Sequence, residues 1–150
     1  MRVVLQLVKN ASVEVGGEKV AQIGKGFLLF AAFTPGDDED VAKKMAEKIC
    51  KLRIFPDETG KTNRSLDDVG GRILSVSQFT LYASVKEGNR PSFSASMRKE
   101  EATLLYDAFV LALKKIRPDT VSGIFHADMD VMLHNDGPFT LILDSKELFA

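Results

Sequence analysis

The sequence predicts a β-rich α/β fold in a single domain over residues 1–150, built as two packed sheets or a partial barrel with two helices on the outside. Roughly seven or eight segments have strand-like composition, whereas only two have the apolar spacing of a helix. Gly16-Gly17 separates two strand-like segments, as in a β-hairpin. A chain of 150 residues buries about 70% of its unfolded surface, so it needs neither a metal nor a disulfide to hold a core.

The N-terminal part of the chain is strand-like. Residues Arg2–Lys9 are rich in Val and Leu, and the segments 12–15 and 19–23 flank Gly16-Gly17. Gly26–Phe33 is an almost continuous apolar run. Its length and composition are typical of a strand that is buried on both faces.

Two segments have helical spacing. The acidic residues 37–40 suit a helix N-terminus, and the helix that follows should end near Leu52. Its apolar positions are Val41, Met45, Ile49 and Leu52. A second helix is predicted from about Arg98 to Arg117, where Pro118 stops it. Its apolar face consists of Ala102, Leu105, Tyr106, Phe109, Ala112, Leu113 and Ile116.

The rest of the chain predicts short strands joined by polar connections. Further strands are expected at residues 53–55, 72–81, 120–125, 129–134 and 139–143. The segments 57–71 and 85–96 are polar and contain glycine, so they are predicted to be loops. Asn135-Asp136-Gly137-Pro138 has the composition of a turn between the last two strands.

Composition limits the possible functions. The formal net charge of −1 provides no global field that attracts nucleic acid, so any RNA contact must come from a local patch or a small pocket. Cys50 is the only cysteine, which excludes an intrachain disulfide. The N-terminal segment does not have the pattern of a signal peptide, and the apolar run Phe27–Phe33 is too short to cross a bilayer. We therefore expect a cytoplasmic protein with no membrane partner.

Three polar segments are candidates for chemistry. Ser77-Gln78-Phe79-Thr80 lies near the end of a predicted strand, where open-sheet proteins place their sites. Asn135-Asp136-Gly137-Pro138 contains a Gly-Pro bond, and bonds to proline adopt the cis form more readily than others. Gly88-Asn89-Arg90-Pro91-Ser92-Phe93 is a stiffened loop with one cation. Each segment also has an ordinary interpretation: a polar strand end, a hairpin connection and a solvated loop.

Taken together, at these separations, the three segments resemble the D-aminoacyl-tRNA deacylase family. The resemblance covers essentially the whole chain, because Gln6–Val13, Leu52–Phe55 and Leu105–Asp107 match further landmarks of that family. It implies a homodimer with a β-rich α/β fold. It also implies an enzyme that cleaves the ester between a D-amino acid and the 3′-terminal adenosine of tRNA, and that removes glycine mischarged onto tRNA.

The resemblance also implies roles for individual residues. Ser77–Thr80 would form the catalytic pocket that holds the aminoacyl ester. Gly137-Pro138, joined by a cis bond, would reach from one subunit into the pocket of the other and act as a gate for chirality. Asn135, from the same motif, would contribute to substrate binding, and Phe125 and Met129 would pack around the terminal adenosine.

The chemistry of the substrate is consistent with such a gate. A pocket that accepts any D-side chain can read only the arrangement of groups around the α-carbon. Rejection of the L-form must then come from a clash, which a rigid backbone element produces better than a mobile side chain. Glycine has no side chain to clash, so its removal from mischarged tRNA is a natural second activity.

The attacking group has two candidate identities. Thr80 could be the nucleophile, but a hydroxyl needs a base, and the only histidines, His126 and His134, belong to neither motif. The alternative, which the resemblance favours, is assistance by the 2′-OH of the substrate ribose, with backbone N–H groups around Gln78 to Thr80 steadying the oxyanion. One position departs from the family, whose members usually carry Arg where this chain has Leu7. In the family that arginine lies near the Gly-Pro pair, so its absence here leaves open how the turn is braced, or moves that task to another cation.

Two other classes of function compete with this interpretation. His126, Asp128, Asp130 and His134 alternate, so a strand would place them on one face, where they could bind zinc or manganese. A strand places its ends too far apart for one ion, so we expect no metal and no cofactor. The other class is a module that binds tRNA ends without chemistry, through a basic patch of Arg90, Arg98, Lys99, Lys114, Lys115 and Arg117. A solvated helix face explains most of these cations equally well.

Overall fold

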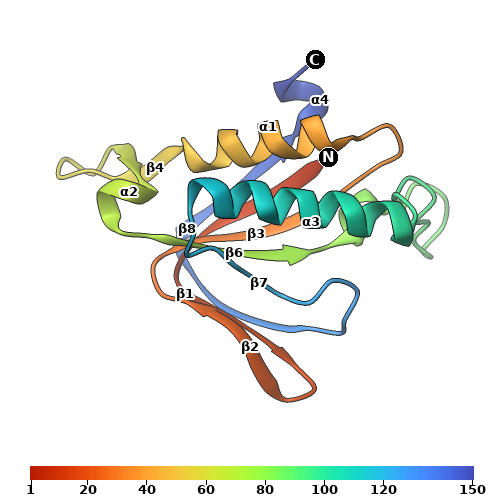
Figure 1. Ribbon diagram of the computed structural model, residues 1–150, viewed down its shortest axis with the longest axis horizontal. Coiled ribbons are helices and arrows are strands. Elements are labelled where there is room, and N and C mark those ends of the chain that lie inside the picture. Colours follow the sequence, from red (N-terminus) through yellow and green to blue (C-terminus); the bar gives the residue numbers. More distant parts are fainter.

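The computed structural model describes residues 1–150, and its largest element is a six-stranded mixed sheet (Figure 1). Strand β1 has 14 residues and pairs with three others: with β3 along its first half, with β2 along its second half, and with β8 along nearly its whole length. These pairings are antiparallel, whereas β3–β6 and β6–β7 are parallel. The six strands are β1 (Arg2–Val15), β2 (Glu18–Ile23), β3 (Gly26–Ala32), β6 (Arg72–Ser77), β7 (Val121–Ser122) and β8 (Asp130–Asp144).

The sheet curls until its two ends meet. β2 and β7, the first and last strands in the order β2-β1-β3-β6-β7, contact each other, and β2 also contacts β6. This closure makes the sheet a partial barrel, which confirms the predicted β-rich α/β class. A separate two-stranded sheet, β4 (Arg53–Pro56) and β5 (Thr62–Ser65), lies at one end of the molecule beside the short helix α2 (Leu66–Val69) (Figure 1).

Two long helices, α1 (Glu39–Cys50) and α3 (Lys99–Ile116), lie side by side over one face of the sheet (Figure 1). The carboxylate of Asp38 accepts a hydrogen bond of 2.9 Å from the N–H of Val41 and caps α1, as the acidic cluster predicts. Both helices lie on the outside, as predicted. The short helices α2 (Leu66–Val69) and α4 (Ser145–Leu148) were not predicted, because a single turn has no repeating apolar face.

Apolar side chains fill both sides of the sheet. The larger cluster lies between the sheet and the two long helices, and contains Phe27 and Leu29 from β3 together with Met45 and Phe109. The smaller cluster lies inside the curl and contains Leu28. Successive residues of β3 thus enter the two clusters in turn, so β3 is buried on both faces, as predicted.

Two regions of the N-terminal half differ from the predicted boundaries. The residues 2–15 form one strand, because β8 pairs along β1 past the polar residues Lys9 and Asn10. The segment 57–71, predicted as a loop, contains β5 and α2. Its polar composition hides these elements, since side-chain hydrogen bonds around Asp57 shape the connection while Leu66 is the buried apolar anchor of α2.

Three boundaries around the candidate site are also wrong. The strand predicted at 72–81 ends at Ser77, where the chain enters a 3₁₀ turn, η1 (Phe79–Tyr82). The strand predicted at 120–125 is only the two-residue β7. The predicted turn at 135–138 lies inside the continuous strand β8, because β1 continues alongside it and the extra residues form a bulge.

Candidate active site

The segment Ser77–Thr80 forms a sharp change of direction at the C-terminal end of β6. The parallel ladder with β3 carries Ser77 to a position opposite Ala31, and the N–H of Gln78 donates a last hydrogen bond of 2.8 Å to the Ala31 carbonyl. The chain then turns into η1, so that Phe79 and Thr80 become exposed. Ser77 and Gln78 are half-buried. The segment therefore presents backbone as well as side chains to the solvent.

The start of η1 leaves backbone donors free. The first N–H groups of a helical turn have no partner within that turn. Neither the Phe79 nor the Thr80 N–H donates a hydrogen bond to a side chain or to the loop and turn carbonyls of the chain. Adjacent, unpaired N–H groups can bind a developing oxyanion, so this turn has the donors that ester cleavage requires.

The Thr80 hydroxyl has an amide rather than a base as its neighbour. The side chain of Gln78 donates a hydrogen bond of 2.6 Å from Nε2 to Thr80 Oγ1. No histidine or carboxylate hydrogen-bonds to this hydroxyl. The arrangement orients Thr80 but provides no group that would remove its proton.

Side chains distant in sequence hold η1 in place. Arg2 donates a hydrogen bond of 2.8 Å from Nη1 to the Leu81 carbonyl, and its guanidinium lies 4.7 Å from the centre of the Tyr82 ring. The same arginine pairs with Asp144 at 3.0 Å, which ties the turn to the end of β8. On the other side, the Ser96 hydroxyl donates a hydrogen bond of 2.9 Å to the Phe79 carbonyl. These residues carry no local signal in the sequence, since each acts on a partner many positions away.

The Arg-Pro-Ser-Phe loop lies beside this turn. Ser84 and Ser92 exchange two backbone hydrogen bonds of 2.8 Å, which brings the end of the loop back to its start. Phe93 packs edge-on against Phe79, with ring centroids 5.2 Å apart, and both rings are partly exposed. The fold therefore brings together two of the three candidate segments.

A groove of about 310 Å³ runs between α3 and the segment that follows β7. Tyr106 and Phe125 line it with their rings 5.4 Å apart, and the Tyr106 hydroxyl lies 3.1 Å from the hydroxyl of Ser75 on β6. Burial raises the pKa of the Tyr106 hydroxyl, which therefore stays neutral. Ser77, two residues along β6, faces the same side of the sheet as Ser75. The groove and the turn thus open on one face of the molecule.

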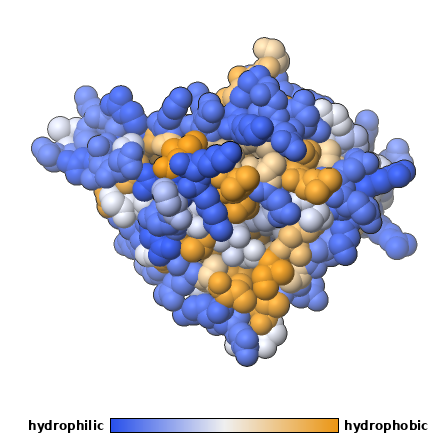
Figure 2. Space-filling model, in the orientation of Figure 1, coloured by the Kyte–Doolittle hydropathy of each residue, from blue (hydrophilic) through white to orange (hydrophobic).

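The surface around α3 is partly apolar. Figure 2 shows separate apolar patches, some at the level of the two long helices and one below them, with hydrophilic side chains between and around them. Exposed large apolar residues on α3 and after β7 include Leu104, Leu111 and Ile124. An apolar surface with a few polar groups suits a nucleoside better than a phosphate.

Met129 lies on the other side of the groove wall from Phe125. Phe125 packs against the larger apolar cluster, whereas Met129 packs against the smaller one inside the curl. A Cβ atom on Gly123, which lines the groove, would lie only 2.6 Å from the Met129 sulfur. Met129 therefore supports the groove from behind through Gly123.

Gly137 and Pro138 lie on a bulge of β8 and are exposed, and the bond between them is cis. The backbone of Gly137 has φ +134°, and a Cβ atom there would lie 2.9 Å from the Phe139 nitrogen. Asn135, at the base of the bulge, donates hydrogen bonds from Nδ2 to the carbonyls of Leu7 and Phe139 at 2.9 and 3.0 Å. The motif is a protruding backbone element rather than a turn between strands.

The Ser77–Thr80 turn and the bulge that carries Gly137-Pro138 lie at opposite ends of the sheet. Through the strand register, Ser77 is level with Val3 and Leu143, whereas Asn135 is level with Arg72. Five residues along β6 therefore separate the two levels, which corresponds to about 17 Å, and three strand spacings add about 14 Å across the sheet. Gly137-Pro138 cannot reach the Ser77–Thr80 turn of its own chain.

The residues of the metal alternative are not gathered by the fold. Asp130 and His134 lie on β8, but His126 precedes the strand in a left-handed conformation with φ +67°. The assumption that one strand carries all four is therefore wrong. No group of three or more His, Cys, Asp or Glu side chains is arranged to hold a metal ion.

The cations of the proposed basic patch are also dispersed. Arg98 and Lys99 lie at the start of α3 and Lys114 and Lys115 near its end, so the rise of the helix separates the two pairs by about 23–26 Å. Arg117 pairs with Asp67 and donates to the Gly71 carbonyl. These residues do not form one patch.

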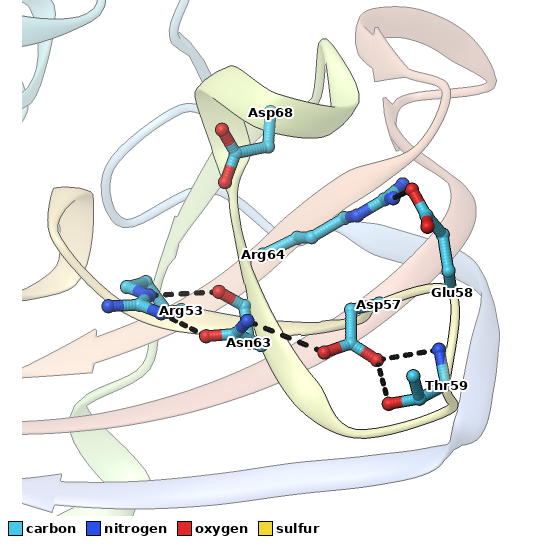
Figure 3. Close-up of a pocket in the computed structure, with 7 residues that line it drawn as sticks. All are labelled: Arg53, Asp57, Glu58, Thr59, Asn63, Arg64 and Asp68. Carbon is cyan, nitrogen blue, oxygen red and sulfur yellow. Dashed lines mark hydrogen bonds and ion pairs between the residues drawn. The ribbon is translucent and has the colours of Figure 1, made fainter.

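A cavity of about 640 Å³ lies on the β4–β5 hairpin, and no apolar residue lines it (Figure 3). Its side chains satisfy one another. Asp57 accepts hydrogen bonds from Thr59 and Asn63, Arg53 donates to Asn63, and Arg64 pairs with Glu58. None of the candidate site residues lines this cavity, and its hydrogen bonds are those of a closed polar hairpin.

No helix of the structure combines the length and the apolar character needed to cross a membrane.

Comparison with known proteins relates this architecture to one family. The family model described as D-Tyr-tRNA(Tyr) deacylase matches residues 4–144. A D-aminoacyl-tRNA deacylase of Lactobacillus acidophilus is 54% identical over 144 residues, which cover 96% of this chain and 99% of the relative. A D-aminoacyl-tRNA deacylase of Thermus aquaticus is 52% identical over 147 residues, which cover 98% of this chain and 97% of the relative.

Two solved structures share the fold. One is described as the c-Myc DNA unwinding element binding protein; it is 41% identical, has a TM-score of 0.89, and the match covers 96% of this chain and 98% of the other. The second is described as a probable eukaryotic D-amino acid tRNA deacylase. It has a TM-score of 0.84 at 19% identity, with 95% of this chain and 97% of the other covered, and shows the likeness of the fold alone.

Proposed function

Because the chain belongs to the D-Tyr-tRNA(Tyr) deacylase family, we propose that it hydrolyses the ester of D-aminoacyl-tRNA in the cytoplasm and thereby proofreads mischarged tRNA. The products are the free D-amino acid and tRNA with a free 3′-OH. The observation that carries this proposal is the turn at Ser77–Thr80, whose Phe79 and Thr80 N–H groups begin η1, have no partner within it and lie at an exposed strand end.

In the proposed reaction, water attacks the ester carbonyl carbon, and negative charge develops on the carbonyl oxygen. The Phe79 and Thr80 N–H groups bind this oxyanion. The hydroxyl of Thr80 receives a hydrogen bond from Gln78 and has no base beside it. The 2′-OH of the terminal ribose therefore assists the attack, and the ester bond to the 3′-oxygen then breaks.

The terminal adenosine is assigned to the groove between α3 and Phe125. The groove offers the half-buried ring of Phe125, backed by the buried Tyr106, for stacking, and a serine hydroxyl, Ser122, for a polar contact. Met129 supports it through Gly123. Since the cations on α3 are dispersed, contact with tRNA is confined to its acceptor end, and binding should depend only modestly on salt.

Chirality is read by a second subunit. Gly137-Pro138 protrudes and is exposed, but lies too far from the Ser77–Thr80 turn of its own chain to meet a substrate there. In a two-fold symmetric homodimer, the same element of the partner would cover the pocket. Its rigid backbone would exclude an L-side chain while admitting a D-side chain or glycine, so glycine mischarged onto tRNA is the proposed second substrate.

A mixed-dimer experiment tests both the enzyme and the gate. Wild-type protein should release D-tyrosine from D-Tyr-tRNA and glycine from Gly-tRNA, and spare L-Tyr-tRNA. Pro138→Ala should gain activity toward L-Tyr-tRNA. Adding an excess of Phe79→Pro protein, whose own pocket lacks a donor but whose gate is intact, should then suppress that L-activity as subunits exchange.

The outcomes test the deacylase activity and the cross-subunit gate separately. No release of D-tyrosine beyond buffer by wild-type protein would rule out the deacylase. If Phe79→Pro protein leaves the L-activity of Pro138→Ala unchanged under conditions where subunits exchange, the gate acts within its own chain or not at all. Light scattering on the wild-type protein gives the oligomeric state independently.

A further inference from the structure

The bulge that carries Gly137-Pro138 is unusually long for its partner strand. Gln6 pairs with Thr140 and Val8 pairs with Asn135, so a single residue of β1, Leu7, faces four residues of β8. An ordinary bulge places two residues opposite one. The backbone between Asn135 and Thr140 therefore leaves the ladder and needs another source of hydrogen bonds.

Asn135 provides the side-chain hydrogen bonds at the base of this bulge. Its Nδ2 donates to the Leu7 carbonyl on β1 at 2.9 Å and to the Phe139 carbonyl at 3.0 Å. The first bond ties the bulge to the neighbouring strand, and the second joins its two ends. Both protons of the amide are engaged by the protein, so this nitrogen is not free to bind a substrate.

No other side chain holds the bulge between Asn135 and Thr140 by a hydrogen bond or an ion pair. The Leu7 side chain is buried in the larger apolar cluster and contributes only its carbonyl to the bulge. No arginine or lysine forms an ion pair with Asp136. No other side-chain hydrogen bond reaches the residues 136–139.

We propose that Asn135 is the positioning residue of the chirality gate, and that its amide braces the bulge that carries Gly137-Pro138. This inference rests on the proposed role of Gly137-Pro138. Asn135 acts through the backbone of the bulge and does not touch the substrate. Its loss should loosen the position of the gate in the partner pocket and leave the hydrolytic turn at Ser77–Thr80 intact.

The test compares Asn135→Asp with Asn135→Ala. The aspartate has nearly the same shape, cannot donate when ionised, and places a negative charge beside two carbonyl oxygens. Losing two hydrogen bonds of ordinary strength should lower the ratio of kcat/KM for D-Tyr-tRNA over L-Tyr-tRNA by about tenfold or more. Asn10→Asp, an exposed change on β1 opposite His134, is the control and should keep the ratio.

A merely structural role predicts a different pattern. It would lower both activities together, in proportion to the loss of folded protein, and leave their ratio unchanged. Asn135→Ala removes the donors without adding charge, so it preserves the test if the aspartate variant does not fold. An unchanged ratio in the folded Asn135 variants, while Pro138→Ala lowers it, overturns the role of Asn135 alone. An unchanged ratio in Pro138→Ala as well rejects the proposed gate itself.

Discussion

The side-chain amide of Gln78 donates a hydrogen bond of 2.6 Å to the hydroxyl of Thr80. An amide orients a hydroxyl but does not take its proton, and neither histidine of the chain hydrogen-bonds to Thr80. This contact bears on the two mechanisms that the sequence leaves open, attack by the Thr80 hydroxyl and attack assisted by the 2′-OH of the tRNA. A side-chain nucleophile would need a base that is absent, whereas RNA-assisted attack needs only backbone donors and an ordered pocket.

Thr80→Ala should therefore retain substantial deacylase activity. The variant keeps the backbone N–H of residue 80 and loses only the hydroxyl, so we expect a loss within about tenfold in the single-turnover rate on D-Tyr-tRNA. Gln78→Ala, which removes the other half of the contact, is the matched comparison. A loss of several orders of magnitude in Thr80→Ala, with the fold intact by circular dichroism, would instead identify the hydroxyl as the nucleophile.

The backbone donor of Phe79 can be removed on its own. Residue 79 begins the 3₁₀ turn, where proline is tolerated, and Gln78 before it has φ −146° and ψ 77°, outside the helical region. Phe79→Pro loses the ring and the N–H, whereas Phe79→Ala loses only the ring. If the N–H binds the oxyanion, kcat of the proline variant should be lower than that of the alanine variant by about 10²- to 10³-fold. Equal kcat values would remove this N–H from the mechanism.

Arg2 should affect both stability and rate. Arg2→Met removes the hydrogen bond to Leu81 and the pair with Asp144, which are partly exposed, so unfolding should become easier by about 1–2 kcal/mol in urea titrations. Because η1 loses its brace, kcat should fall as well. Lys146→Met, a neighbouring cation that forms no ion pair, is the control. An unchanged kcat in Arg2→Met would show that the turn holds its shape without this contact.

The ion pair between Arg2 and Asp144 predicts that the stability of the protein depends on pH. Although burial opposes it, the Lys146 N–H and the Arg2 guanidinium hold the pKa of Asp144 below its ordinary value. A depressed folded-state pKa contributes stability above the unfolded pKa and loses it as pH falls through the folded value. Arg2→Met should therefore raise the pKa of Asp144 in an NMR titration. The difference in free energy of unfolding between Arg2→Met and wild type should become smaller under acid conditions. A pKa of Asp144 that does not change would assign its depression to the Lys146 N–H and the N-terminal ammonium.

The regular elements could be predicted from the sequence because their signals are local. The apolar spacing of α3 and the double-sided burial of β3 each lie within one segment, and both predictions are confirmed. The predicted strand at 72–81 is too long because apolar composition continues to Leu81, whereas the ladder with β3 ends at Ser77. Local composition does not report where a partner strand stops.

The organisation of the candidate site depends on contacts that are distant in sequence. Arg2 and Leu81 are 79 positions apart, and Asn135 and Leu7 are 128 positions apart. The turn predicted at 135–138 is a bulge because β1 runs unbroken beside it, which only the pairing reveals. The candidate residues could be named from the resemblance, but their division between two ends of the sheet required the fold.

His126 offers a last test, one that concerns the stability of the groove. It is the only residue other than glycine with a positive φ, +67°, and it directly follows Phe125 in the groove wall. This conformation costs a residue with a side chain about 1–2 kcal/mol, part of which is offset because glycine loses more chain entropy on folding. His126→Gly should therefore raise the free energy of unfolding by up to about 1 kcal/mol.

His134→Gly, within the regular strand β8, is the control and should lower the free energy of unfolding by about 0.5–1 kcal/mol. Urea titrations compare the two variants, since both lose an imidazole, and the two sites differ in backbone conformation and in the edge-on contact of His126 with Phe125, whose ring centroids lie 6.1 Å apart. A loss of stability in His126→Gly as large as that in His134→Gly would mean that the imidazole makes contacts that outweigh the backbone cost.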